Sequence, residues 1–169
     1  RRSLAADADF VEARVQLAQD LLRLGQEAEG WEQAELAYKA DGYNTTLFNL
    51  LQLKDSLNRF TTLKSEHFQV RMETREAAVY GPRVIELLEQ AWTELTARYE
   101  FTPQIPVYVE IYPRVDDFAV RTFGVPDVAG FLGVCFGKIV TANSPATRKE
   151  NPGSWESVLW HEFCHVITL

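Results

Sequence analysis

The spacing of apolar residues changes near residue 60, and this change limits the folds open to the chain. Before it, apolar side chains recur at helical spacing; after it, short alternating stretches are interleaved with helical ones. The stretch 67–72, HFQVRM, places every second side chain on one face of a strand. We therefore predict an α+β protein, with a helical part at residues 1–60 and a mixed sheet with helices at residues 61–169.

Three helices are predicted in residues 1–60. The first is expected to have Asp9 as its N-cap and to stop at Gly25. The second covers about 31–40, and the third follows Asn44, a favourable cap. The next segment, 58–67, has few core-like residues and is interpreted as a linker between the two parts.

The predicted elements of residues 61–169 are a strand at 67–72, a helix at 74–101, a strand at 105–113, a short helix at 116–124, a strand pair within 130–145 and a final helix after Ser154. Thr74 and Asp116 are the expected caps of the first two helices. Glu110 falls on the outward face of its strand and is interpreted as a surface charge. Two roles stay open for Arg121, a structural one and contact with a substrate. Residues 148–150 are interpreted as a solvated loop.

Composition excludes some classes of partner. A net charge of -7 argues against nucleic acid or an anionic membrane, because both favour Lys and Arg. No apolar run is long enough for a membrane span, and no signal-peptide core is visible, so the compartment stays open. The absence of an initiator Met and the end at Leu169 lead us to expect a segment of a longer protein.

The last predicted helix contains the pentad His161-Glu162-Phe163-Cys164-His165. Histidines at i and i+4 leave one face of a helix about a turn apart, which lets both ring nitrogens reach one Zn²⁺. Glu162 lies about 100° further round the helix, where it flanks the metal and can act as a general base and acid. The neighbours of the pentad are uncharged and mostly apolar, and such surroundings exclude ionisable groups unless these are paired or bind metal.

Several alternatives remain open around the pentad. The two histidines could instead be satisfied by ordinary hydrogen bonds. Cys164 is either a zinc thiolate or a small buried side chain, the second being favoured, and a disulfide to Cys135 is left open. His67 is considered as a third ligand but interpreted as a surface residue at the start of a strand.

Thr168 stands where metzincins carry the Gly of their extended zinc motif, so the pentad resembles that of the gluzincins, the thermolysin-like zinc peptidases. The segments 116–127 and 130–137, ahead of 155–169, resemble bacterial tetratricopeptide-linked proteins of the peptidase MA-like group. This resemblance covers residues 61–169 and implies the N-terminal half of a zincin fold. It implies a Glu ligand and a transition-state-stabilising Tyr or His after Leu169, and a cleft rim formed by 134–137 or 138–142.

Residues 1–60 resemble a single tetratricopeptide repeat. The residues at its signature positions are Leu17, Ala18, Leu21 and Ala37. Arg14 replaces the usual Trp and Gly42 the usual Pro, so a generic helical hairpin is the alternative. The resemblance implies a surface for a protein partner.

Together these features predict zinc-dependent hydrolysis of peptide bonds in the complete protein, with His161 and His165 as ligands and Glu162 as the catalytic residue. We expect the 169 residues alone to hold Zn²⁺ weakly and to be inactive. We also expect the apolar side of the last helix, formed by Phe163, Val166, Ile167 and Leu169, to need cover from another chain. The alternative is a non-enzymatic protein-binding module with a structural or vestigial metal site.

Overall fold

The computed structural model describes residues 1–147 and 154–169. The predicted polar loop at 148–150 lies outside the described residues. Helices and a five-stranded mixed sheet make up the fold, which confirms the predicted α+β class. None of the helices in the described ranges is both long enough and apolar enough to cross a membrane.

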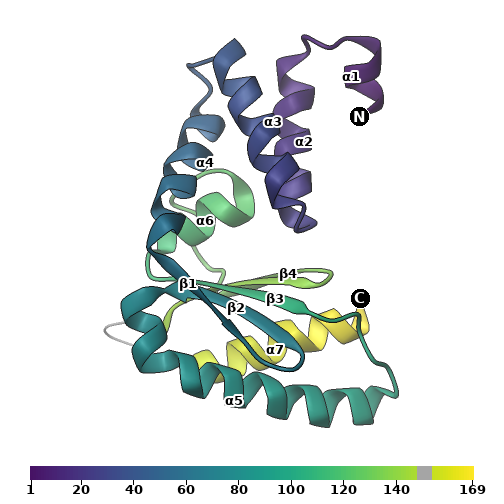
Figure 1. The fold of residues 1–169 in the computed structure, drawn as a ribbon, viewed down its shortest axis with the longest axis vertical. Coiled ribbons are helices and arrows are strands. Elements are labelled where there is room, and N and C mark those ends of the chain that lie inside the picture. The colour runs from purple at the N-terminus through teal and green to yellow at the C-terminus, as the bar shows by residue number, and fades with distance from the viewer. Residues whose placement is uncertain (148–153) are drawn as a thin grey trace.

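The chain begins with four helices, which stand on one side of the sheet (Figure 1). These are α1 (Arg2–Ala6), α2 (Val11–Arg23), α3 (Glu27–Ala40) and α4 (Thr45–Ser56). Asn44 caps α4 as predicted, since its side chain accepts a hydrogen bond from the Leu47 N–H at 3.1 Å. The N-cap predicted for α2 was wrong. Phe10 is the N-cap, and Asp9 instead donates its backbone N–H to the Asp7 carboxylate. Gly25 follows α2 with a φ of 75°, a backbone conformation that favours glycine.

The sheet has five strands in the order β1-β2-β3-β5-β4. Their bounds are β1 (Phe60–Lys64), β2 (Phe68–Glu73), β3 (Val107–Tyr112), β4 (Gly133–Phe136) and β5 (Ile139–Asn143). The three inner strands are parallel, and each edge strand is antiparallel to its neighbour. The strand pair around Gly137 and Lys138 is therefore confirmed.

The prediction of a linker at 58–67 was wrong for half of its length, because residues 60–64 form the edge strand β1. An edge strand bonds to one neighbour only and keeps most of its side chains partly exposed, so its sequence lacks the apolar signal of an inner strand. Pairing with β2, which sets Leu63 opposite Val70, supplies the backbone hydrogen bonds that hold it.

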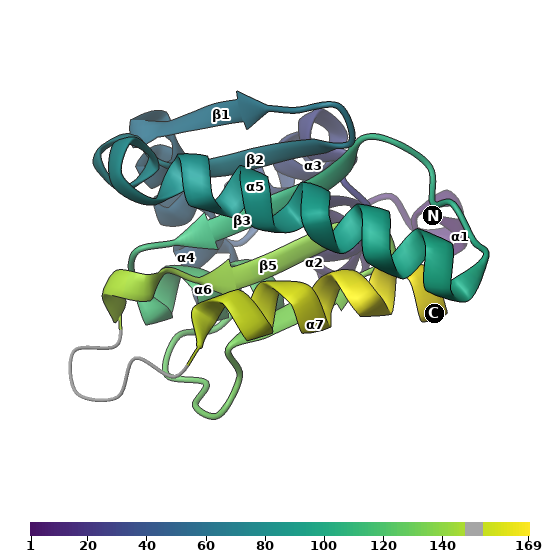
Figure 2. The ribbon, with the colours of Figure 1, turned by 90° about the horizontal axis from the view of Figure 1, so that it is seen from below.

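Two helices, α5 (Thr74–Tyr99) and α7 (Trp155–Thr168), run side by side across one face of the sheet (Figure 2). The main core lies between them and the strands, with side chains that are at most 8% exposed: Phe68, Val70, Met72, Val109, Ile111, Val84, Leu88, Trp92, Leu159, Phe163 and Ile167. The predicted cap Thr74 was wrong by one residue. Glu73 is the N-cap of α5, and its carboxylate accepts hydrogen bonds from the Arg75 and Glu76 N–H groups.

The expectation that α7 needs cover from another chain was wrong for Phe163 and Ile167, because both are buried within this chain. Phe163 is fully buried, and its ring packs edge-on against Phe68, with 5.1 Å between the ring centroids, and stacks near Trp92. Ile167 is 8% exposed and belongs to the same core. Val166 is partly buried against this core, whereas Leu169 is 90% exposed and projects into solvent.

The opposite face of the sheet carries α6 (Val115–Phe123) and the lower ends of the N-terminal helices (Figure 1). The cap predicted for α6 was wrong: Arg114 is its N-cap, and Asp116 lies in the first turn. Two arginines join α2 to α6 by donating to backbone carbonyls. Arg121 donates to the Leu22 carbonyl at 2.9 Å, and Arg23 donates to the Thr122 carbonyl at 3.0 Å.

Glu110 of β3 is the centre of a buried charge network on this face. It is 4% exposed, so its interpretation as a surface charge was wrong. Arg71 and the Tyr112 hydroxyl donate hydrogen bonds to its carboxylate, and Arg121 Nε lies 2.8 Å from its Oε2 as a charge contact. Arg71 also pairs with Glu27 at the start of α3, which ties the N-terminal helices to the sheet. Burial alone raises the pKa of Glu110, but Arg121 and Arg71 outweigh it and hold the pKa at about 2.

This depressed pKa predicts an acid-sensitive fold. Because the pKa of Glu110 is lower in the folded chain, its ionisation stabilises the fold above pH 4.5, and this stabilisation is lost as the pH falls towards 2. Glu110→Gln should lower the free energy of unfolding by roughly 3 kcal/mol at pH 7, measured by urea denaturation, and by much less at pH 3. Glu86→Gln, at an exposed carboxylate, is the control and should change little. Equal unfolding of wild type and Glu110→Gln at pH 7 would show that the network does not stabilise the fold.

Candidate active site

One side of α7 packs into the core, and the opposite side carries the two histidines of the pentad. Ser154 begins the helix by accepting a hydrogen bond from the Ser157 N–H at 3.1 Å, as predicted. Leu159 and Phe163, one turn apart, are buried in the core. At 3.6 residues per turn, His161 and His165 then leave the helix on the side opposite Phe163.

The two histidine rings converge. His161 Nε2 and His165 Nε2 are 3.0 Å apart, and the ring planes are nearly perpendicular. Two nitrogens that bind one tetrahedral Zn²⁺ at about 2.0–2.1 Å are roughly 3.4 Å from each other, so a small opening of the rings would admit the metal. The 3.0 Å separation is that of a hydrogen bond between the two rings, and the donor type and donor atoms fit zinc once the rings open.

Glu162 lies beside the histidines and against the edge strand β4. It is 7% exposed, and burial raises the pKa of its carboxyl while the two histidines oppose this shift. Its position depends on Gly133: a Cβ atom there would lie 2.6 Å from Glu162 Cγ and 3.0 Å from its Oε1. Any larger residue at position 133 would therefore push the Glu162 side chain away from β4.

A cavity of about 470 Å³ opens beside this group. Its walls are the loop 130–133 on one side and Ser157, Val158, His161 and Glu162 of α7 on the other. Sequence reasoning found the two histidines and Glu162 but missed the loop. The paired glycines of 130–133, GFLG, were the available signal, since Gly130 has a φ of 93° and Gly133 makes the close approach to Glu162.

Within the described residues, two candidate metal ligands meet at this place, and no cluster of three or more His, Cys, Asp or Glu side chains able to hold a metal is found. A catalytic zinc usually has three protein ligands. His67 is engaged elsewhere, because its Nδ1 lies 2.6 Å from the Glu89 carboxylate and its ring stacks on Trp92. Cys164 Sγ lies 3.8 Å from the Tyr99 hydroxyl, and Cys135 and Cys164 are both free thiols in this structure.

Of the two segments expected to form a cleft rim, only 134–137 lies at the border of the sheet. Residues 134–136 belong to β4, which has no strand on its other side among the described residues, whereas 139–142 belong to β5 inside the sheet. Burial and the nearby Glu162 raise the pKa of the Cys135 thiol on β4 to about 11. Cys135 is therefore protonated at neutral pH.

The close approach of Gly133 predicts an energetic coupling to Glu162. The backbone of Gly133 lies outside the left-handed region, so Gly133→Ala should act only through the new contact and lower the free energy of unfolding by about 1–3 kcal/mol. In a Glu162→Ala background the clashing atoms are gone, and the same substitution should be nearly neutral. Denaturant unfolding of the four proteins of this cycle measures the coupling. Equal effects in both backgrounds would mean that Glu162 does not occupy this position.

Searches against protein-family models, curated proteins and solved structures returned no significant match to the chain.

Proposed function

We propose that this chain carries the amino-terminal part of a zinc-dependent peptidase of the thermolysin-like type. The supporting observation is the convergence of the His161 and His165 Nε2 atoms, 3.0 Å apart, beside the buried carboxyl of Glu162. Two imidazoles on the outside of a helix with no hydrogen-bonding partner but each other, within the described residues, are well suited to a shared cation. The cavity next to them gives a substrate access to Glu162.

In this proposal His161 and His165 hold the metal through Nε2. Zinc in such a site lowers the pKa of a water molecule and polarises a carbonyl group. Glu162 takes the proton from the attacking water and delivers it to the nitrogen of the leaving amine. The partly apolar surroundings that raise the pKa of Glu162 favour both steps, because they bring the proton affinity of the carboxylate closer to that of the groups with which it exchanges.

The arrangement of the sheet also supports the zincin proposal. An antiparallel edge strand, β4, lies ahead of the pentad helix in the chain, separated from it by β5, and borders it in space. The free side of β4 offers backbone groups to which an extended peptide substrate can add as a further strand. The proposal places the third ligand and a transition-state-stabilising group on residues other than the 169 of this chain.

The mechanism predicts a separation between metal binding and catalysis. Glu162→Gln in the full-length protein should lower kcat for peptide hydrolysis by about 100-fold to 10,000-fold, because the amide cannot accept the proton. Its zinc content, measured by atomic absorption, should equal that of the wild type. His161→Ala should lose both zinc and activity, whereas His67→Ala, at the histidine that pairs with Glu89, should retain both. Unchanged hydrolysis by Glu162→Gln would contradict the mechanism.

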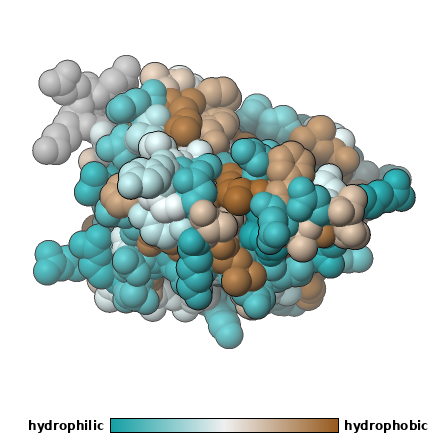
Figure 3. Space-filling view, turned by 90° about the horizontal axis from the view of Figure 1, so that it is seen from above, coloured by the Kyte–Doolittle hydropathy of each residue, from teal (hydrophilic) through white to brown (hydrophobic). Residues whose placement is uncertain are grey.

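A second candidate is a non-enzymatic module that recruits a protein through the N-terminal helices. Three apolar side chains on α3, α4 and their connection favour it: Leu36 is 41%, Phe48 47% and Tyr43 99% exposed. In the view onto the N-terminal helices, hydrophobic residues lie among hydrophilic ones (Figure 3). Under this proposal the full-length protein binds a partner, and a zinc ion that is bound without peptide hydrolysis has a structural role.

A further inference from the structure

One side chain of the N-terminal helices contacts both α6 and the edge strand beside the candidate site. Arg23 is the last residue of α2, and its Nη2 and Nε donate to the Thr122 carbonyl of α6 at 3.0 and 3.3 Å. Its guanidinium also lies over the ring of Phe136 on β4, 5.5 Å from the ring centroid. Arg23 therefore joins three elements, α2, α6 and β4.

A chain of buried hydroxyl groups continues this contact towards the site. The Thr122 and Thr141 side chains are fully buried, and their Oγ1 atoms lie 3.2 Å apart. The Thr141 hydroxyl in turn donates to the Val134 carbonyl of β4 at 3.4 Å. Val134 follows Gly133, the residue whose lack of a side chain leaves room for Glu162. α6 is thus tied to β4 one residue away from the contact with the proposed general base.

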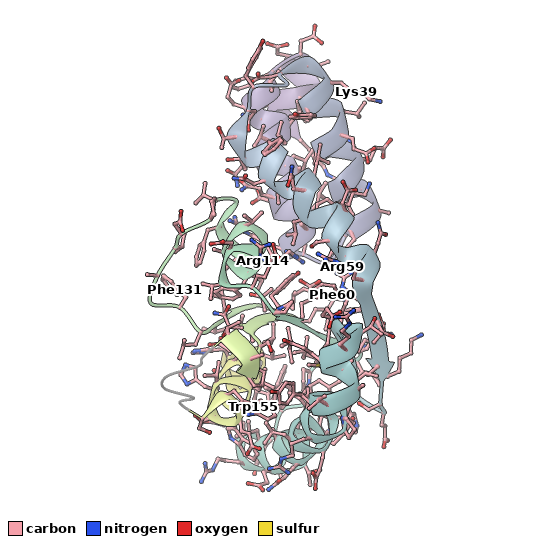
Figure 4. The ribbon with its side chains drawn as sticks, turned by 90° about the vertical axis from the view of Figure 1, so that its left-hand side faces the viewer. Lys39, Arg59, Phe60, Arg114, Phe131 and Trp155 are labelled. Atoms are coloured by element: carbon pink, nitrogen blue, oxygen red, sulfur yellow. The ribbon has the colours of Figure 1, made fainter. Side chains whose placement is uncertain are left out.

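The other wall of the site also rests on α6. Figure 4 shows α6 and the loop that carries Phe131 between the N-terminal helices and α7. Phe123 of α6 packs against Phe131 with 5.0 Å between the ring centroids, and Phe131 belongs to the wall of the cavity beside Glu162. At the end of α6, a Cβ atom on Gly124 would lie 2.0 Å from the Gln19 side chain of α2, so the two helices are in direct contact there.

We infer that Arg23 is a positioning residue of the candidate site, because it holds α6 and the Phe136 end of β4 and so sets where β4 meets Glu162. A planar guanidinium can stack on an aromatic ring and donate in its own plane to a carbonyl group at the same time. The N-terminal helices are then part of the site rather than a separate module. The effect of Arg23 on hydrolysis rests on the proposed peptidase function, whereas its effect on β4 does not.

A purely local role for Arg23 makes a different prediction. An arginine in the last turn of a helix is favourable there because of the helix dipole, and Arg23 Nη1 lies 3.7 Å from the Asp20 carboxylate on the same helix. If this were its whole role, replacing Arg23 would weaken α2 without a change that is specific to β4.

Hydrogen–deuterium exchange of the full-length protein distinguishes the two roles without any catalysis. Arg23→Ala should speed amide exchange in β4 about fivefold or more, because β4 loses its link to α2, and should leave the inner strand β2 unchanged. Arg14→Ala is the matched control: Arg14 also lies on α2, but it donates to Gln33 and to the Ala8 carbonyl within the N-terminal helices. The inference is overturned by unchanged exchange in β4, by equal acceleration in β2, or by the same acceleration in Arg14→Ala.

Phe136→Leu tests the link itself and provides a second variant. It keeps an apolar side chain on β4 but removes the ring face that Arg23 covers. If Arg23 holds β4 through this ring, the double variant should exchange in β4 no faster than Arg23→Ala alone. Rate increases that multiply in the double variant would contradict the contact with Phe136 as the link.

Kinetics separate this inference from the proposed function. Because β4 is the proposed contact for the substrate backbone, Arg23→Ala should raise KM for a peptide about threefold or more, with unchanged zinc content. A mere loss of folded protein would lower the apparent kcat and leave KM as it is. If hydrolysis requires Glu162 but KM does not change in Arg23→Ala, the positioning role is wrong and the peptidase function stands. If no peptide is cleaved while Arg23→Ala speeds exchange in β4 alone, the peptidase function fails and the positioning of β4 by Arg23 remains.

Discussion

The packing of one face of α7 into the sheet core determines the candidate site. Leu159, Phe163 and Ile167 recur every four residues and are buried between the sheet and α5. With this face fixed, helical geometry directs His161 and His165 away from the core. It also directs Glu162 towards β4, where Gly133 leaves room for the carboxyl. The site thus needs both an apolar stripe that anchors the helix and a strand position without a side chain.

The other face of the sheet is organised by charge rather than by apolar packing alone. Glu110 gathers Arg71, Arg121 and Tyr112 around one buried carboxylate, and Arg71 extends the network to Glu27 at the start of α3. Buried ion pairs contribute less to stability than their Coulomb energy suggests, since desolvation opposes it. Their directional contacts, together with the arginine–carbonyl bonds between α2 and α6, instead fix how the N-terminal helices meet the sheet.

The sequence predicted those features that depend on local pattern. Alternation identified β2 and β3, the caps Asn44 and Ser154 were found, and the i, i+4 spacing placed both histidines on one side of α7. The exact first residues of α2, α5 and α6 were misplaced by one or two positions. The larger misses depend on residues far apart in the chain. Glu110 alternates like a surface residue and is buried only because Arg71 and Arg121 meet it from other elements. The paired glycines of 130–133 mark an unusual segment, but that Gly133 approaches Glu162, 29 positions away by residue number, cannot be read from local pattern.

The proposed site requires that one zinc ion binds His161 and His165 and that no thiolate is among its ligands. Zinc K-edge X-ray absorption on the full-length, zinc-loaded protein measures the ligand atoms directly. We expect nitrogen and oxygen neighbours at about 2.0–2.1 Å, with two imidazole contributions that vanish in His161→Ala/His165→Ala. A sulfur neighbour at about 2.3 Å, or a zinc environment unchanged by the double substitution, would contradict it.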